Sequence, residues 1–476
     1  MLSLPKPILG MGLAYVRIVR VNKPFIMKRS IMKTYKLYMI LTLLVSFSQV
    51  YGRGLPVSKE QYFSEMRLET SVEGMTYPTD YDDSKQAYRM EMSFNRNQSL
   101  LGDLQWSLDA KLWVSTPQEV AHWFNVPQAN VTYRTYNWFA SLGRYLPPWG
   151  GVSYYSPIQQ IFPTFNIDPL NYEMNGLTGF YSAFDNNSFS YEFFYSPLFI
   201  PHSGGARYKE DEDGLLLPAS RWAQPLFYSF KKGEVLVPLK YKLGQFDLKD
   251  IIFQNSFAGR VKYESKYFEV AVAAAYVVDP EARLHLDPNV EFKDEKDLQT
   301  VVKIYPEFYA QQVYGFEAKI RPLVSDRINF LFESAYINPE NPKDSEKNII
   351  KHKRINNLLG VSYLGQHTFI KHLSSGVLYS KEFEEEIQPS FIKLEEANLR
   401  FFSNIEAKLF SKLSILFFAE SDFKLDDTAL KTSLLYKITN SIQVSSGVDI
   451  LKGAANTYWG QFGSHDRVWF KVHYVF

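Results

Sequence analysis

The chain has 476 residues, a formal net charge of +1 and no cysteine, and aromatic residues make up 16% of it. A nearly neutral, aromatic-rich composition excludes a disordered chain and a strongly basic nucleic-acid-binding protein. The missing cysteine excludes disulfide scaffolds, iron–sulfur clusters and cysteine nucleophiles, and no apolar run is long enough for a membrane-spanning helix.

Residues 27–52 have the order of a secretory signal peptide. A basic segment precedes an apolar run, Leu37–Phe47, which is too short to span a membrane as a helix. Val50 and Gly52 are suitably placed before a cleavage site. We therefore expect an exported protein whose mature chain begins near Arg53, with residues 1–26 an upstream extension. An N-terminal membrane anchor is the alternative.

From about residue 60 the chain alternates between apolar and polar residues, in segments of roughly 9–14 residues. In one such segment Leu108 lies on the apolar face and Ser107 on the polar face, and Phe330 and Asn329 are related in the same way. A soluble sandwich and a transmembrane barrel could both use this pattern.

Segment length separates the two architectures. Strands of soluble proteins have about 5–6 residues, whereas a tilted membrane strand needs about 9–11. The signal peptide and the aromatic content, which is expected of interfacial girdles, favour the same solution. The sequence therefore predicts an all-β fold, a transmembrane antiparallel up-and-down β-barrel over residues 60–476.

The last ten residues, Arg467–Phe476, form an amphipathic segment that ends in an aromatic residue, with another aromatic, Tyr474, two positions earlier. This segment resembles the C-terminal assembly signal of bacterial outer-membrane β-barrels. The resemblance implies an outer-membrane location, contact with lipid and lipopolysaccharide, and recognition of Tyr474 and Phe476 by the barrel-assembly machinery. Residues 460–472 are also similar, more weakly, to the closing hairpin of porin-like and alginate-export-type barrels.

Turns divide the body into about eighteen strands, within a range of roughly 16–20. Eight short turns alternate with longer connections, as expected for inner turns and outer loops. The longest outer loops are 146–176, 198–255 and 280–308, and residues 226–245 could add one more hairpin. The acidic run Glu210–Asp213 could bind Ca²⁺, but it lacks a defined ligand spacing, which favours a solvated loop tip.

The loop 146–176 is rich in proline and aromatic residues, a composition typical of an ordered loop. We expect it to fold inward and narrow the lumen; a loop packed over the barrel rim is the alternative. The predicted constriction residues are Trp149, Tyr154, Tyr155, Gln159, Gln160, Phe162, Phe165, Asn166 and Tyr172.

Charges of both signs alternate along the polar faces of the strands. The predicted pore-lining residues are Glu65, Arg67, Glu69, Arg89, Glu91, Asp109, Lys111, Glu317, Lys319 and Arg321. A barrel of eighteen strands leaves an aqueous channel or a plugged lumen. Mixed charge argues against a steep ion filter, and the missing basic excess argues against polyanion export.

One fragment offers catalytic chemistry. His372–Gly376 resembles part of the H-x-S-N-G signature of outer-membrane phospholipases, and His372 and Ser374 would share a strand face. Ser375 stands where that signature has asparagine, and this face is predicted to be lumenal, away from lipid. We therefore expect two polar lumen residues and no enzyme, and we expect neither metal nor cofactor.

These observations predict an outer-membrane porin or channel for the passive passage of small hydrophilic solutes. The alternative is a non-conducting surface barrel with adhesive or structural outer loops.

Overall fold

A computed structural model describes residues 64–476, except for 82–83, 102, 117–121, 151–154, 187, 205–207, 224–228, 233–234, 295–296, 323–326, 343–350, 366–368, 384–398 and 455–456. The predicted signal peptide, 27–52, and the predicted extension, 1–26, lie outside the described residues. Within the described part, helices of the length and apolarity needed to cross a membrane do not occur.

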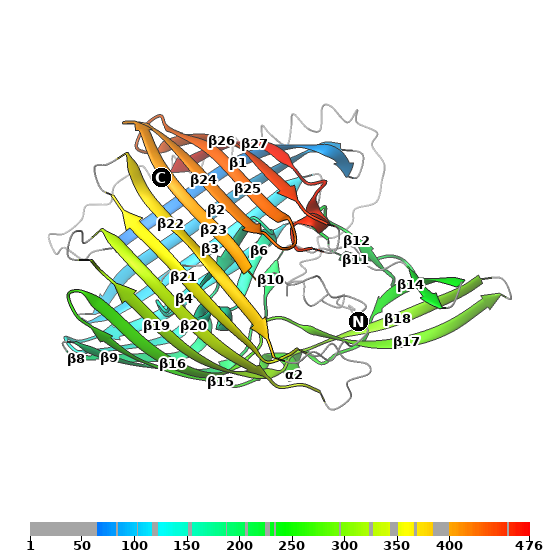
Figure 1. Ribbon diagram of the computed structural model, residues 1–476, viewed down its shortest axis with the longest axis horizontal. Helices are drawn as coiled ribbons and strands as arrows, with labels where there is room; N and C mark the ends of the chain where they lie inside the picture. The colour runs from blue at the N-terminus through cyan, green and yellow to red at the C-terminus, as the bar shows by residue number, and fades with distance from the viewer. Residues whose placement is uncertain are drawn as a thin grey trace.

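Eighteen antiparallel strands form one closed sheet, which confirms the predicted barrel (Figure 1). Most of these strands have 10–13 residues, because the alternating pattern runs uninterrupted over that length. In wall order they are β1 (Ser64–Tyr81), β2 (Ser84–Leu101), β3 (Leu104–Thr116), β4 (Trp123–Arg134), β5 (Trp138–Tyr145), β8 (Leu177–Asn186), β9 (Phe189–Leu198), β15 (Ser256–Glu264), β16 (Phe268–Val278), β19 (Ala310–Ile320), β20 (Ile328–Pro339), β21 (Arg354–Leu364), β22 (Ile370–Glu382), β23 (Leu399–Phe410), β24 (Leu413–Asp422), β25 (Asp427–Lys437), β26 (Ile442–Lys452) and β27 (Arg467–Val475).

The last strand closes the barrel on the first. β27 pairs with β1 from Glu69↔Val475 to Thr76↔Val468, and the backbone N–H of Phe476 donates to the carbonyl of Leu68 at 2.9 Å. Among the described strands, closure leaves no strand edge of the wall unpaired, which is the condition for a sheet to stand in hydrocarbon.

The two faces of the wall differ as the alternation predicts. Val272 and Phe330 point outward and are 53% and 50% exposed, whereas their neighbours Ala271 and Leu331 point inward and are 2% and 3% exposed. Large apolar and aromatic side chains are exposed on the outer face, which is the arrangement of a barrel wall in contact with lipid.

Short turns join the strands at one end of the barrel, and the long connections, such as 146–176 and 199–255, lie at the other end. Residues 226–245 do contain the extra hairpin, made of β13 (Ser229–Lys232) and β14 (Val235–Leu243). This hairpin does not enter the wall. It joins β18 (Asp297–Glu307) and β17 (Arg283–Asp294) in a four-stranded sheet that extends away from the barrel (Figure 1).

Smaller elements complete the loop end of the barrel. Tyr208, Leu216, Tyr241, Val302 and neighbouring apolar residues form the core beneath the projecting sheet. The other elements there are β10 (Ser203–Gly204), β11 (Tyr208–Glu210), β12 (Leu216–Pro218), the short helix α2 (Leu248–Ile252) and the 3-10 helix η4 (Gly460–Phe462). In the acidic run, Asp211 accepts hydrogen bonds from the backbone of Asp213 and Leu215.

Candidate constriction of the barrel lumen

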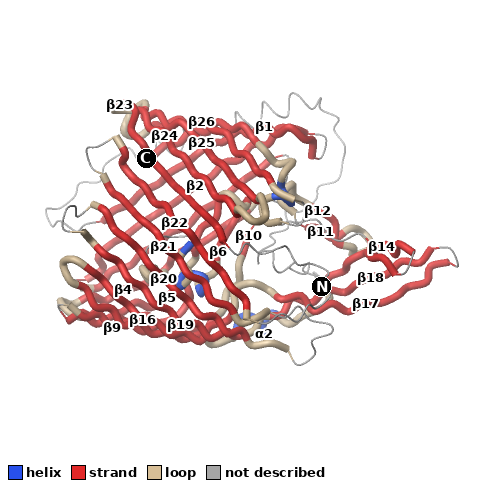
Figure 2. Tube along the Cα trace, in the orientation of Figure 1, coloured by secondary structure: helices blue, strands red, loops and turns tan. Residues whose placement is uncertain are grey.

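The loop 146–176 leaves β5 after Tyr145 and returns to β8 at Leu177. It contains the 3-10 helix η3 (Ile158–Ile161) and the strands β6 (Thr164–Asp168) and β7 (Asn171–Met174). Figure 2 shows η3 within the outline of the barrel, and η3 contacts the wall strands β19 and β20. This part of the loop therefore lies against the wall strands β19 and β20.

Apolar packing holds one side of the loop to the inner wall. Ile158, Ile161 and Phe162 are almost fully buried against wall residues of β9, β19 and β20, including Val313 and Ile337. Gly315 of β19 permits this close approach, because a Cβ there would lie 2.7 Å from the Ile158 side chain. Burying large apolar side chains is worth about 1.5–3 kcal/mol each, which favours the docked loop.

Further along the loop, Phe165 reaches the strands at the start of the barrel. Its ring stacks on Trp113 at 4.7 Å and on Trp123 at 5.8 Å between centroids. These aromatic pairs fix β6 against β3 and β4, and aromatic stacking adds about 0.5–1.5 kcal/mol per pair beyond the buried area.

Polar contacts fasten the loop to carboxylates of the wall. Trp149 Nε1 donates to Glu192 of β9, and the backbone N–H of Gly150 donates to Glu317 of β19 at 3.3 Å. Gly150 adopts a φ of 82°, a left-handed conformation that favours glycine. Two more acceptors are Glu333 of β20, which binds Ser156 Oγ, and Glu420 of β24, which binds the Tyr155 hydroxyl at 2.8 Å.

The tip of the loop reaches the other side of the barrel. Glu173 forms an ion pair with Lys111 of β3, and Lys431 of β25 donates to Asn171 at 3.0 Å. Leu170 packs against a cluster that includes Leu451 and Trp469. The loop thus contacts wall strands around most of the circumference and crosses the lumen.

The predicted constriction residues take different places in this arrangement. Trp149, Phe162 and Phe165 are buried, and Tyr155 stacks on Phe402 with 3.9 Å between centroids. The side-chain amides of Gln159 and Gln160 already bind protein: Gln159 donates to the Trp149 carbonyl, and Gln160 accepts from Asn356 at 3.0 Å. Asn166 pairs with Gly204 in the sheet β10–β6–β7, whereas Tyr154 and the Tyr172 side chain lie outside the described part.

The predicted pore-lining residues fall into two groups. One group lies on β1–β3, where Glu69 contacts Arg67 and His473, Arg89 pairs with Glu73, Glu91 pairs with Lys471 and Asp109 lies near Lys111. The side chain of Glu65 lies outside the described part. The other group is on β19 and just beyond it: Glu317 and Lys319 lie in β19, and Arg321 follows its last residue.

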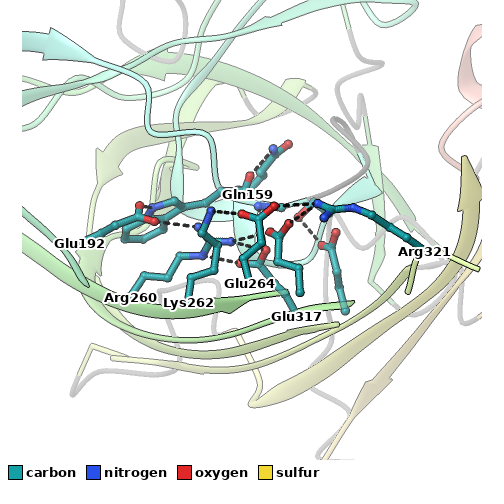
Figure 3. A network of polar contacts seen from close by, with 12 residues as sticks. Gln159, Glu192, Arg260, Lys262, Glu264, Glu317 and Arg321 are labelled. Atoms are coloured by element: carbon teal, nitrogen blue, oxygen red, sulfur yellow. Dashed lines mark hydrogen bonds and ion pairs between the residues drawn. The ribbon is translucent and has the colours of Figure 1, made fainter. Parts of the chain in front are cut away.

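Around Glu317 and Arg321, ion pairs form one continuous network (Figure 3). Arg260 contacts Glu192 and Glu317, Arg321 contacts Glu264 and Glu269, and Lys262 contacts Glu264. Arg260 also lies 3.9 Å from Glu269, and this contact joins the two groups. Sequence reasoning did not single out Glu192, Arg260, Glu333 or Glu420 as loop anchors. Their inward positions in alternating strands mark them as lumenal, but only the folded chain shows their partners.

The charged pairs of the lumen differ in accessibility. Beneath the loop, the side chains of Arg260 and Glu192 are 4% and 5% exposed. Towards β1–β3 and β27, those of the pairs Lys111–Glu173 and Lys471–Glu91 keep 22–31% of their surface accessible. Buried and accessible pairs occur on both sides, since Arg89 and Glu73 near β1 are 9% and 8% exposed and Arg321 and Glu264 near β19 are 24% and 41% exposed. The loop therefore covers some ion pairs of the inner wall, while others retain contact with water.

A second outer segment closes part of the barrel mouth. Trp222 packs between Tyr77 of β1 and Phe462 of η4, and the guanidinium of Arg221 lies 3.9 Å from the Tyr77 ring centroid. His465 Nε2 donates to the Arg221 carbonyl at 2.6 Å. This segment narrows the mouth on the side of β27 and β1.

A histidine ties the constriction loop to the outer loops. Thr164 donates its backbone N–H to His202 Nδ1 at 2.8 Å, directly before the parallel pairing of β10 with β6. Burial lowers the pKa of His202, so the ring stays neutral and can accept this bond.

The fragment His372–Gly376 lies on β22. Ser374 is buried on the inner face, as predicted, and His372 lies two residues away on the same face. Among the described residues no hydrogen bond joins the His372 and Ser374 side chains, whereas Ser375 bonds to Ser403 at 2.7 Å.

A closed barrel of eighteen antiparallel strands with an apolar outer face and a charged interior is a transmembrane β-barrel of the bacterial outer-membrane type. No family model matches the chain, and none of the curated proteins matches it.

Solved structures with similar architecture include OccAB3 of Acinetobacter baumannii, with 12% identity, a TM-score of 0.45, and coverage of 87% of this chain and 99% of that one. OccD3 (OpdP) of Pseudomonas aeruginosa has 11% identity and a TM-score of 0.45, with coverage of 87% and 91%. OccK11 (OpdR) of the same organism has 10% identity and a TM-score of 0.44, with coverage of 87% and 95%.

Proposed function

We propose that the protein is a passive outer-membrane channel for small hydrophilic solutes, narrowed by the loop 146–176. The observation that carries this proposal is that the loop covers only part of the charged inner wall. The loop buries the wall around Arg260 and Glu192, while Glu91 and Lys471, which pair with each other, stay accessible. Solutes would pass between the loop and the accessible wall.

The charges along this path favour solutes that are neutral or weakly charged. Lys371 lies 2.7 Å from Glu406, and Arg400 lies 2.9 Å from Glu420. Like Lys471 beside Glu91, each cation has a carboxylate partner. A steep ion filter uses rings of charges of one sign, and these pairs of opposite charges do not form such rings. We propose that size, set by the loop, selects solutes more strongly than charge does.

Replacing residues 150–172 with a short Gly/Ser linker tests the constriction. We expect a higher single-channel conductance in planar bilayers and the passage of larger neutral solutes, because the linker cannot make the apolar and carboxylate contacts described above. A matched control shortens 285–305 in the projecting hairpin β17–β18, which lies outside the lumen, and should leave conductance unchanged. Unchanged conductance in a folded, inserted loop variant would remove the loop from the transport mechanism.

The alternative is a non-conducting surface barrel, and the projecting sheet of β13, β14, β17 and β18 favours it, since a sheet standing away from the barrel is suited to external contacts. Conductance of the wild-type protein separates the two. A correctly inserted barrel without measurable current or solute flux would support the alternative. Under either proposal, lipopolysaccharide surrounds the outer half of the wall, the assembly machinery recognises Tyr474 and Phe476, and the chain performs no catalysis.

A further inference from the structure

Arg260 lies on the inner face of β15 and is buried beneath the constriction loop. Its guanidinium makes a fork with Glu317, with Nε 3.0 Å from Oε1 and Nη2 2.8 Å from Oε2. Its Nη1 donates to Glu192 Oε1 at 2.9 Å. One arginine therefore joins carboxylates of β9 and β19 through charge-assisted hydrogen bonds (Figure 3).

The same two carboxylates hold the start of the loop. The second oxygen of Glu192 accepts from Trp149 Nε1 and, at 2.8 Å, from the Tyr181 hydroxyl. Glu317 Oε2 accepts from the backbone of Gly150 at 3.3 Å. Trp149 is 1% exposed, so its indole N–H depends on Glu192 for a partner.

Removing the cation would leave two buried carboxylates close together without compensation. Their repulsion would move them apart towards water, which would disturb the acceptors of Trp149 and Gly150. Because Arg260 is itself 4% exposed, its charge contributes little to the accessible passage directly.

We propose that Arg260 is a positioning residue for the constriction: it holds the carboxylates of Glu192 and Glu317 in place, and they hold the loop against the wall. One consequence of the inference, a stable passage of fixed width, rests on the proposed channel function. The position of the loop itself can be measured without any current.

The absence of native cysteine provides the assay, because an introduced cysteine is the only thiol in the chain. Ile161 is 2% exposed in the apolar contact between loop and wall and lies apart from the ion pairs. In an Ile161→Cys barrel we expect slow reaction with a charged thiol reagent. Adding Arg260→Gln should speed labelling by about tenfold or more, the change produced by about 1.4 kcal/mol of weaker docking.

Lys262→Gln is the matched control. Lys262 lies two residues further along the same face of β15 and pairs with Glu264, which does not anchor the loop. It should leave labelling of the Ile161→Cys barrel unchanged. Arg260→Lys keeps the charge but loses the fork, so it should give an intermediate rate. This variant also serves if Arg260→Gln fails to insert.

A rescue separates positioning from simple loss of packing. Adding Glu192→Gln and Glu317→Gln to Arg260→Gln removes both unpaired charges and keeps acceptor oxygens for Trp149 and Gly150, so protection should partly return. Single-channel records of Arg260→Gln should show larger and less steady currents. Wild-type labelling rates in folded Arg260→Gln and Arg260→Lys barrels, or an equal increase with Lys262→Gln, would overturn the inference. A wild-type barrel without current would instead overturn the channel function and leave the labelling result valid.

Discussion

Val272 lies at the centre of the outer face of β16, and replacing it with arginine tests whether this face meets the hydrocarbon of the membrane. Phe268 precedes it by four residues and Tyr276 follows it by four, both on the same face. With a rise of about 3.3 Å per residue and a tilt of about 45°, each aromatic lies about 9 Å from Val272 along the membrane normal. In an apolar band about 25 Å tall, Val272 is then close to the midplane.

The surroundings of Val272 set the size of the effect. Its cross-strand neighbours are Val261 and Phe316, both apolar and both facing outward. An arginine there would meet hydrocarbon, and midplane arginine on a barrel wall costs about 2–4 kcal/mol. Ile320, which pairs with Phe268 at the edge of the band, is the matched control. Ile320→Arg should cost about 0–1 kcal/mol, since its charge can reach the interface.

The assay is urea-dependent unfolding of the barrel from lipid vesicles, compared for wild type, Val272→Arg and Ile320→Arg. We expect the free energy of unfolding to fall in the order wild type, Ile320→Arg, Val272→Arg. If Val272→Arg were as stable as Ile320→Arg, the outer face of β16 would not lie in hydrocarbon, and the assignment of inner and outer faces would be wrong.

Other predictions concern the loop 146–176, the closing strand, the hydrogen bond between Thr164 and His202, and the N-terminus. Phe162→Ala removes a buried ring and should weaken loop docking by about 3–5 kcal/mol, seen as protease cleavage within 146–176 of a barrel that stays intact. Deleting Phe476 should lower the yield of inserted barrel far more than deleting an exposed loop residue, measured by heat-modifiable migration on gels. The pKa of His202 is lowered in the folded protein, so below about pH 6.5 the undocked ring binds more protons than the docked ring. The hydrogen bond from Thr164 should therefore weaken as the pH falls below this value. His202→Gln should remove this pH dependence of loop protection. N-terminal sequencing of the membrane-purified protein should begin near Arg53, and retention of Leu37–Phe47 would contradict the signal peptide.

The architecture of the wall could be predicted from the sequence because its signals are local. Alternation at Leu108 or Phe330 assigns each side chain to a face, since successive residues of a strand point to opposite sides. Segment length separates a membrane strand from a soluble one. Turns at fixed intervals then give the strand number, and closure by the last strand follows because an open edge is not tolerated in hydrocarbon.

The surface against which each loop packs could be determined only from the tertiary structure. The pattern in residues 226–245 predicts a hairpin, but it does not say that β14 pairs with β18 in a sheet outside the wall. The composition of 146–176 likewise predicts a loop with apolar area to bury, but both the inner wall and the rim could provide that surface.

The wall carboxylates that bind the constriction loop show the same limit of sequence-based prediction for single residues. Glu333 meets Ser156 across 177 positions of sequence, and Glu420 meets Tyr155 across 265. Each carboxylate has the pattern of any inward-facing charge in its own strand, so the sequence by itself determines that it is lumenal. Its partner is decided only when barrel closure brings distant strands around the loop, because a hydrogen bond depends on position in space and not on the local alternation that formed the strand.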